Sequence, residues 1–221
     1  MTRSKSFTAP FTVRIDTREQ LPYTFEGLRF DADRDCVPMT VPCEVGTLKT
    51  GDYSIVGMED LVTVERKSLA DLYSTLGQGR ERFEEEHRRM AELVFAAVVI
   101  EADWQTILRY PPSHSQLNPK CVFRTMLSWQ QRYGVVWMAI GVPMPPTLGD
   151  VPPELIPPRV RELMAEERIP VQSRVQWEHA LREDIRATNS RRLAEATTFR
   201  LLEKFWQHQH KPFPKRRQSP C

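Results

Sequence analysis

Two acidic residues and one lysine in the first third of the chain have the types and the spacing of a metal-dependent hydrolytic site. Asp52 precedes a short apolar run, and Glu65 and Lys67 follow a second one, residues 61–64. Both runs are rich in β-branched residues and bounded by turn residues, which predicts two strands joined by a turn at residues 57–60. Because side chains alternate along a strand, Glu65 and Lys67 share one face, and Asp52 on the neighbouring strand can reach it.

This set of side chains suits the hydrolysis of a phosphodiester bond. Two carboxylates can bind a hard divalent cation, for which Mg²⁺ is the first choice because it prefers oxygen ligands and retains several waters; Mn²⁺ is the alternative. Such an ion polarises the scissile phosphate and lowers the pKa of a bound water. Lys67 would orient that water and offset charge on the phosphoryl oxygens. A surface hairpin with a Glu65–Lys67 ion pair is the competing interpretation, and Asp52 on the preceding strand favours the metal site.

The same residues resemble the signature of the XPF-type endonuclease domain, which reads Gly-Asp, a spacer, Glu-Arg-Lys, three residues and Asp. In this chain the signature is Gly51-Asp52, Glu65-Arg66-Lys67 and Asp71. Other segments similar to the family stand in the same order: residues 15–19, 69–72, 79–83 and 98–101. The resemblance covers about residues 11–140 and 190–207. It implies an α/β, restriction-endonuclease-like fold in which helices flank a mixed sheet.

The resemblance also implies roles for individual residues. Those placed at the metal are Asp52, Glu65 and Asp16, with Lys67 positioning the water and Glu19 nearby. Asp71 would begin the next helix and hold an outer-shell water or a hydrogen bond to Arg66 or Lys67. Its alternative role is that of a carboxylate in the first turn of a helix, which the helix dipole favours. The residues expected to act in catalysis are therefore Asp52, Glu65, Lys67, Asp16, Arg66 and Asp71.

Basic residues near these segments are candidates for contacts with DNA. Arg18, Arg66 and Arg80 would either bind phosphate or brace the carboxylates, and the planar fork of arginine suits both tasks. Arg124 lies on a predicted helix that can face DNA in related nucleases, and Lys120 is close to it in the chain. The expected DNA-binding residues are Arg18, Arg80, Lys120 and Arg124.

Length and composition agree with one globular enzyme domain. The chain has 221 residues, 40% of them hydrophobic and 27% charged, which is enough for one sizeable core. The net charge of +2 does not by itself indicate nucleic-acid binding, and no His/Cys group has zinc-site spacing. No apolar stretch approaches the ~20 residues that span a membrane, and the N-terminal segment lacks a signal-peptide core. The sequence therefore predicts a cytoplasmic protein without membrane contact, nucleoid-associated if its source is bacterial.

The order of predicted elements supports the same fold class. Strands are expected at residues 11–16, 41–47, 52–56, 61–66, 95–101 and 135–140, with a loop or hairpin excursion at 20–40. Helices are expected from Ser68, over residues 80–94, from Asp103 to Arg109, and from Asn118 or Ser115 to Tyr133, closed by Gly134. A meander of strands followed by alternating helices and strands predicts a mixed sheet flanked by helices.

The composition changes after Gly141. Prolines crowd residues 142–158, and two charged helical segments are expected at about 156–167 and 174–187. A final apolar helix, about 190–207, is expected to dock on the core. The predicted nuclease domain is therefore 11–141 plus 190–207, with 142–189 as an insertion that clamps substrate, contacts a partner or is only a variable surface excursion. The basic tail, 208–221, is expected to be disordered and either to touch nucleic acid or to remain a solvated end.

The function expected from these residues is that of a Mg²⁺-dependent DNA endonuclease acting at a duplex-to-single-strand transition in repair or recombination. A leaving 3′ oxygen is implied by the family alone. A junction resolvase of the same fold is the second enzymatic hypothesis. From another class, the chain would be a catalytically silent DNA-binding scaffold or nuclease partner subunit, but the intact Asp52, Glu65 and Lys67 favour an enzyme. The expected partners are DNA and a second copy or partner protein; no tandem helix-hairpin-helix module is recognisable, which leaves dimerisation and branched-DNA preference open.

Overall fold

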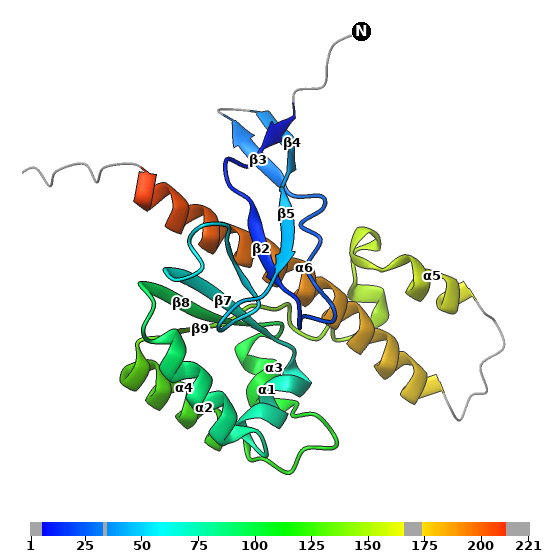
Figure 1. The fold of residues 1–221 in the computed structure, drawn as a ribbon. Helices are drawn as coiled ribbons and strands as arrows, with labels where there is room; N and C mark the ends of the chain where they lie inside the picture. The colour runs from blue at the N-terminus through cyan, green and yellow to red at the C-terminus, as the bar shows by residue number, and fades with distance from the viewer. Residues whose placement is uncertain (1–5, 33–34, 166–173, 211–221) are drawn as a thin grey trace, which may run out of the picture.

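A six-stranded mixed sheet forms the centre of the molecule in the computed structural model, which describes residues 6–32, 35–165 and 174–210 (Figure 1). The strands stand in the order β5-β2-β6-β7-β8-β9. Their bounds are β2 Val13–Asp16, β5 Cys43–Gly46, β6 Tyr53–Ile55, β7 Val62–Lys67, β8 Phe95–Ile100 and β9 Val136–Ala139. Strands β2, β6 and β7 pair antiparallel, whereas β7, β8 and β9 are parallel. The predicted mixed sheet is confirmed.

A second, smaller sheet projects from one end of the central one (Figure 1). It contains β1 Phe7–Thr8, β3 Arg29–Ala32 and β4 Asp35–Thr40 in the order β1-β4-β3. Strands β3 and β4 form a hairpin inside the segment that was expected to be a loop or hairpin excursion.

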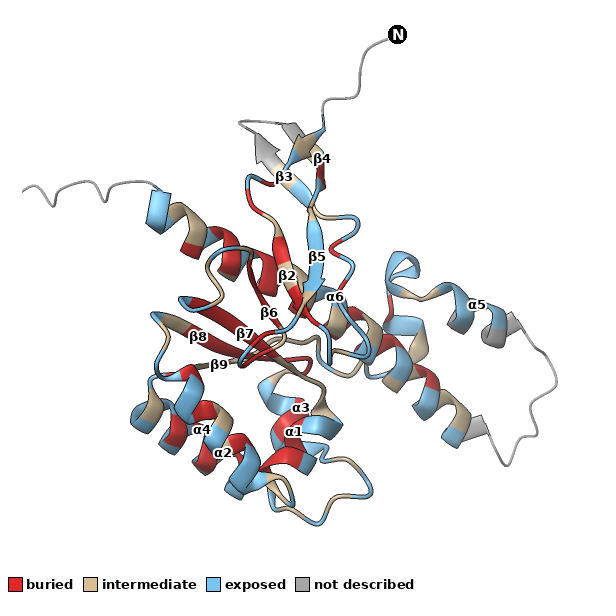
Figure 2. Ribbon diagram, in the orientation of Figure 1, coloured by how far each residue is buried: buried red, intermediate tan, exposed pale blue. Residues whose placement is uncertain are grey.

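One face of the central sheet is covered by α1 Leu69–Leu76, α2 Arg80–Met90, α3 Trp104–Arg109 and α4 Pro119–Tyr133. The caps that the sequence predicted are present: Ser68, Asp103 and Asn118 accept hydrogen bonds from the first turns of α1, α3 and α4. Gly134 closes α4 with φ +70°, a conformation that glycine adopts without steric cost. Apolar side chains of these helices pack on alternate residues of β8 and form one buried cluster (Figure 2).

The opposite face is covered by α6, a single helix from Arg174 to His210 (Figure 1). Ala194, Phe199 and Leu202 pack there against the apolar residues of β2, β6 and β7. The two helices predicted at 174–187 and 190–207 are therefore one continuous helix, and the tail does not begin at 208. Asn189 and Ser190 lie inside this helix and make tertiary hydrogen bonds, from Asn189 Nδ2 to Leu155 O and from Val142 N to Ser190 Oγ.

The segment between β9 and α6 packs on the N-terminal half of α6. It contains η1 Leu148–Asp150, η2 Pro153–Leu155 and α5 Pro158–Ala165. Val151 is buried there against Leu181 and Ile185. The division into nuclease domain and insertion stays a prediction, although α6 crosses the predicted boundary without a break. Residues 211–221 of the predicted tail lie outside the described residues.

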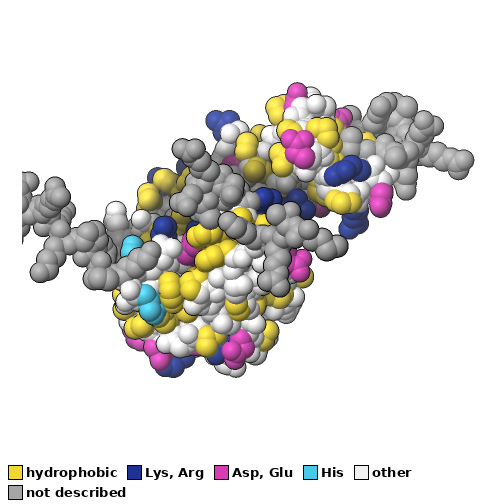
Figure 3. All heavy atoms as spheres, turned by 90° about the horizontal axis from the view of Figure 1, so that it is seen from above, with side chains coloured by type: hydrophobic (Ala, Val, Ile, Leu, Met, Phe, Trp, Pro, Cys, Tyr) yellow, Lys and Arg dark blue, Asp and Glu magenta, His cyan; other side chains and the backbone are white. Residues whose placement is uncertain are grey.

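The surface shows no strong segregation of charge in the view from above. Acidic, basic and apolar side chains are mixed over that face (Figure 3), in keeping with the net charge of +2. No helix in the described ranges combines the length and apolar character that crossing a membrane requires.

Candidate active site

Asp52 is placed by a turn that only glycine can make. Gly51 has φ +75°, and a Cβ at that position would lie 2.0 Å from Thr63 Oγ1, so any larger residue would clash with a buried side chain. The Asp52 N–H then donates to Val64 O at 3.0 Å, which fixes the residue beside β7. Its carboxylate Oδ2 accepts the Arg66 N–H at 2.7 Å. The backbone therefore holds Asp52 against the strand that carries Glu65 and Lys67.

Glu65 and Lys67 lie on the same face of β7, as the alternation of the strand predicted. Lys67 Nζ forms an ion pair with Glu65 Oε1. The two side chains are almost fully buried, with 14% of the Lys67 side chain and 5% of the Glu65 side chain exposed. The Lys67 ammonium also lies over the ring of Phe83, 4.7 Å from its centroid, which adds a cation–π attraction.

These three residues meet in a cleft that opens to solvent. Two adjoining pockets of about 330 and 550 Å³ share the same wall. The residues that line both of them include Asp52, Glu65, Lys67, Asp71 and Arg18. The structure thus brings together the predicted trio and adds a helix N-terminus and an arginine beside it, with room for a phosphate group.

Asp52 and Glu65 are two carboxyls of the cleft whose ionised forms are disfavoured, first of all by burial. Burial raises the pKa of Asp52 to about 6, although the Arg66 N–H and the charge of Lys67 oppose the rise. Burial, followed by the charge of Asp52, raises the pKa of Glu65 well above its usual range, against the opposing effect of Lys67. Two acids that disfavour one another's ionisation in a cleft are typical of functional sites.

Lys67 remains a cation in this setting. Burial lowers its pKa, but the charge and hydrogen bond of Glu65 outweigh burial, so the pKa is raised. The protonated side chain can donate hydrogen bonds and offset negative charge, but it has no lone pair with which to accept a proton. Lys67 therefore suits the orientation of water and stabilisation of charge rather than general-base catalysis.

Asp16 is held away from the cleft. Its Oδ1 accepts the N–H and the Nε–H of Arg18, and its Oδ2 accepts Arg18 Nη2 and the Leu48 N–H, at 2.6 to 3.2 Å. Burial raises its pKa, but these hydrogen bonds outweigh burial and lower it. Asp16 does not line either pocket of the cleft. The expectation that Asp16 binds metal directly stays a prediction; in the structure its oxygens tie β2 to the segment before Gly51.

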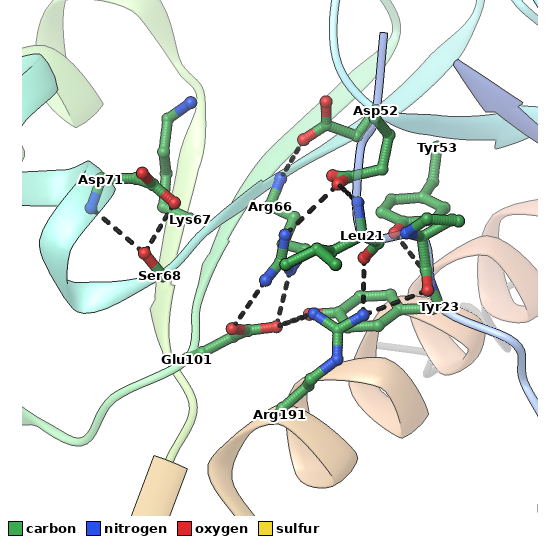
Figure 4. A network of polar contacts seen from close by, with 12 residues as sticks. Leu21, Tyr23, Asp52, Tyr53, Arg66, Lys67, Ser68, Asp71, Glu101 and Arg191 are labelled. Atoms are coloured by element: carbon green, nitrogen blue, oxygen red, sulfur yellow. Dashed lines mark hydrogen bonds and ion pairs between the residues drawn. The ribbon is translucent and has the colours of Figure 1, made fainter. Parts of the chain in front are cut away.

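Arg66 points to the opposite side of β7 and braces the core. Its Nε and Nη2 donate to the two oxygens of Glu101 at 2.7 and 3.0 Å. Tyr23 and Arg191 donate to the same carboxylate at 2.9 and 3.3 Å. Figure 4 shows the Arg66 side chain beside Glu101, with Lys67 pointing elsewhere. Of the two roles left open for Arg66, these contacts favour bracing. Arg66 also lines the smaller pocket of the cleft and pairs with Glu19 at 3.4 Å, so its part in catalysis stays a prediction.

Asp71 caps its own helix. Its N–H donates to Ser68 Oγ at 3.1 Å, and Ser68 Oγ donates back to Asp71 Oδ2 at 2.6 Å (Figure 4). The expected hydrogen bond to Arg66 or Lys67 is replaced by this contact with Ser68. Because Asp71 still lines the cleft, an outer-shell role remains compatible with its position.

The predicted DNA contacts divide into one residue at the cleft and three away from it. Arg18 lines the cleft with 65% of its side chain exposed. Arg80 instead donates to Thr125 Oγ1 at 2.9 Å and lies over the Trp129 ring, so it braces α2 against α4. Lys120 and Arg124 are exposed on α4 and line neither pocket of the cleft.

Three residues of α2 belong to the cleft and were not predicted. Arg82, Glu86 and Arg89 line its larger pocket, and Glu86 Oε1 accepts the Gly51 N–H at 3.5 Å. They share one stripe because positions three and four apart are neighbours on a helix. The sequence signal was available: the buried stripe of Phe83, His87 and Met90 leaves residues 82, 86 and 89 on the adjoining face.

The residues present fit a divalent cation that keeps most of its water. No group of three or more His, Cys, Asp or Glu residues among those described could hold a metal ion alone. Mg²⁺ does not need such a group, since it is commonly held by one or two carboxylates, water and substrate phosphate. Asp52 and Glu65 would be those carboxylates, since both line the open cleft.

Comparison with known proteins places the chain beside one family. A family model described as the ERCC4 domain matches residues 15–139, more than half of the chain. XPF from Aeropyrum pernix is 20% identical over 57% of this chain, with a TM-score of 0.40. The same protein in complex with DNA is 23% identical over 58%, with a TM-score of 0.42. The match spans 55% of the length of each of those chains. No curated protein matches this chain.

Proposed function

Because the chain belongs to the ERCC4-domain family, the family of XPF-type nuclease domains, we propose that it is a divalent-metal-dependent DNA endonuclease. The observation that carries the proposal is the convergence of Asp52, Glu65 and Lys67 on one open cleft. The substrate class is DNA with a junction between duplex and single strand, in repair or recombination. This choice follows from the resemblance to the family. We also propose an intracellular location and a second copy or partner protein as the further binding partner.

The residues of the cleft would divide the chemistry among them. A Mg²⁺ ion bound by Asp52 and Glu65 would supply a Lewis acid for the phosphoryl oxygen and a water of lowered pKa. Lys67 donates hydrogen bonds from its ammonium, which orients the attacking water and stabilises negative charge that develops on the phosphate. Arg18, exposed at the mouth of the cleft, offers a planar fork to a phosphate.

The test is cleavage of three labelled substrates, a flap, a fork and a linear duplex, with Mg²⁺, with Mn²⁺ and with a chelator. The wild type should cut the junction substrates only with a divalent cation. Asp52→Ala and Lys67→Ala should lose cleavage, while Lys204→Ala, an exposed lysine of α6, should retain it. Metal-independent DNA binding with no cutting by any variant would overturn the proposal in favour of the DNA-binding scaffold.

A further inference from the structure

A second cleft lies directly beside the proposed active site. Its volume is about 680 Å³, and its walls come from the start of α1, from residues 109–114 and from the N-terminal half of α6. Lys67 lines the first cleft and the next residue, Ser68, lines the second. Likewise Arg66 lines the first cleft and its ion-pair partner Glu101, 2.7 Å away, lines the second. A strand of nucleic acid that crosses α1 would therefore enter both clefts.

Arg186 gives this second cleft an unmet hydrogen-bond donor. The residue is 5% exposed and lines the cleft. Its Nε and Nη2 donate to Glu183 Oε2 at 3.2 and 2.7 Å, but its Nη1 is buried and has no acceptor within the described part of the chain. A buried charged group with an open donor is costly. An anionic oxygen at the wall of the cleft would supply the missing acceptor.

The start of α1 points to the same kind of ligand. The N–H groups of Asp71 and Leu72 already donate to Ser68, at 3.1 and 3.0 Å. The N–H groups of Leu69 and Ala70 precede them in the first turn, and these two residues line the second cleft. The N-terminus of a helix favours anions through such N–H groups and through its dipole.

The wall of the second cleft carries two acids and two arginines. Its two acids are already engaged: Glu101 accepts hydrogen bonds from Arg66, Arg191 and Tyr23, and Glu183 is paired with Arg186. Arg109 is exposed on the cleft wall at the end of α3. A phosphate group suits this balance, because arginine recognises it with a planar fork.

The wall next to Arg109 offers a surface for a base. Tyr110 lines the cleft with 45% of its surface exposed. Pro111 and Pro112 follow it in the same wall. An exposed aromatic ring next to arginines is the usual platform for unpaired nucleotides, because every base can stack on it. Inside a duplex both faces of a base are covered by its neighbours, so a base that stacks on Tyr110 has left the interior of the duplex.

We propose that this second cleft binds one nucleotide of an unpaired DNA strand, with the phosphate at Arg186, Arg109 and the start of α1 and the base on Tyr110. The inference rests on the proposed function and deepens it, because it puts the single-stranded side of a junction next to the cutting site. It also gives the residues of α6, which lie outside the matched range 15–139, a part in binding the substrate.

The test measures binding of the full chain, in a chelator so that nothing is cut, to three fluorescent probes. The probes are a short oligothymidylate, a duplex and an abasic oligomer of the same length and charge. Arg109→Gln and Tyr110→Ala, both changes of exposed residues, should each weaken oligothymidylate binding at least about fivefold and change duplex binding less than twofold. Arg109→Gln should also flatten the salt dependence by about 0.7 in logarithmic slope. The effect of Tyr110→Ala should vanish on the abasic oligomer.

Two further variants distinguish a local defect in the fold from a loss of nucleotide binding. Arg186→Lys keeps the charge but loses the fork, and should weaken oligothymidylate binding. Arg88→Gln removes an arginine that pairs with a glutamate three residues away, as Arg186 does, but on a different surface; it should bind like the wild type. Oligothymidylate affinities of the Arg109 and Tyr110 variants within twofold of wild type would overturn the inference, whatever the cleavage assays give. If the binding effects are as expected but no DNA is cut in any reaction with Mg²⁺, the proposed function is overturned and the inference about the second cleft stands.

Discussion

Adjacent residues of β7 enter two buried ion pairs that differ in how well their charges are balanced. On the core side, Arg66 and Arg191 both donate to the carboxylate of Glu101. On the cleft side, Lys67 is the ammonium that faces two carboxyls, Glu65 and Asp52, and the pKa of each carboxyl is raised. The carboxylate of Glu101 thus has two arginine donors, and Arg66 also pairs with Glu19 at 3.4 Å. In the cleft, Lys67 pairs with Glu65, whereas Asp52 accepts a backbone N–H.

This difference separates a structural network from a functional one. A buried acid whose oxygens are filled by well-aligned donors has no capacity left for a ligand, and removing one partner leaves a charge stranded. Two acids that share too little positive charge gain free energy when a cation arrives. Because side chains alternate along β7, Arg66 of the structural network leaves the strand on one face, and Glu65 and Lys67 of the proposed metal site leave it on the other.

The largest effect is expected from neutralising an acid of the cleft. Asp52→Asn and Glu65→Gln should each lower the cleavage rate with Mg²⁺ roughly 1000-fold, since a group that stabilises charge in the reaction is lost. Stability to urea, measured in a chelator, should stay unchanged or rise, because the repulsion between the two acids is removed. Glu92→Gln, at an exposed glutamate away from the cleft, is the matched control. A large loss of stability in Asp52→Asn would contradict the contrast between the two faces.

Neutralising Glu101, the acid of the core side, should instead lower the stability of the fold. Glu101→Gln should lower the free energy of unfolding by about 3–5 kcal/mol, because Arg66 loses its bidentate charged partner and keeps only the longer contact with Glu19. The double variant Arg66→Met with Glu101→Leu should recover part of that loss, since no unpaired charge remains at this pair. Urea unfolding followed by circular dichroism measures both changes. A cost below about 1 kcal/mol for Glu101→Gln would show that this network is not a framework.

A smaller effect, on the pH dependence of stability, is expected from His87 in the layer beneath the cleft. His87 is fully buried beside Trp137, and burial lowers its pKa to about 4, against the opposing hydrogen bond to Phe83 O. The unfolded chain takes up this proton near pH 6.5, so stability is complete above that pH and falls as the pH drops toward 4. The loss should approach about 3 kcal/mol at pH 4.

The variant His87→Phe isolates this effect. It removes the titrating group and keeps a ring in the aromatic cluster, so its unfolding free energy should fall less steeply between pH 6.5 and 4.5 than that of the wild type. The difference between the two slopes cancels the contribution of all other titrating groups. Parallel slopes would mean that His87 is protonated as readily in the folded chain as in the unfolded one.

The features that the sequence predicted correctly depend on neighbouring residues. Alternation along β7 assigned Glu65 and Lys67 to one face, and side-chain chemistry assigned the caps at Ser68, Asp103 and Asn118. The signature also identified the family, which the match to residues 15–139 confirms. These signals are carried by a few consecutive residues, so no knowledge of the packing is required.

The features that the sequence missed depend on partners far away in the chain. The sequence did not show that the Leu48 N–H, 32 residues later, takes one of the oxygens of Asp16. It left two roles open for Arg66, and the hydrogen bond to Glu101 shows the bracing role. The two helices predicted at 174–187 and 190–207 are one, and Asn189 and Ser190 within it bond to Leu155 and Val142. Each of these hydrogen bonds joins residues 32 or more positions apart.

The central claim is that Asp52 and Glu65 form a site for a divalent cation, and thermal unfolding with and without Mg²⁺ tests it most directly. Binding to the folded state raises the melting temperature by mass action. The wild type and Glu92→Gln should both gain stability with Mg²⁺, and Asp52→Asn and Glu65→Gln should gain none. Equal stabilisation of all four proteins, or none in the wild type, would contradict the account.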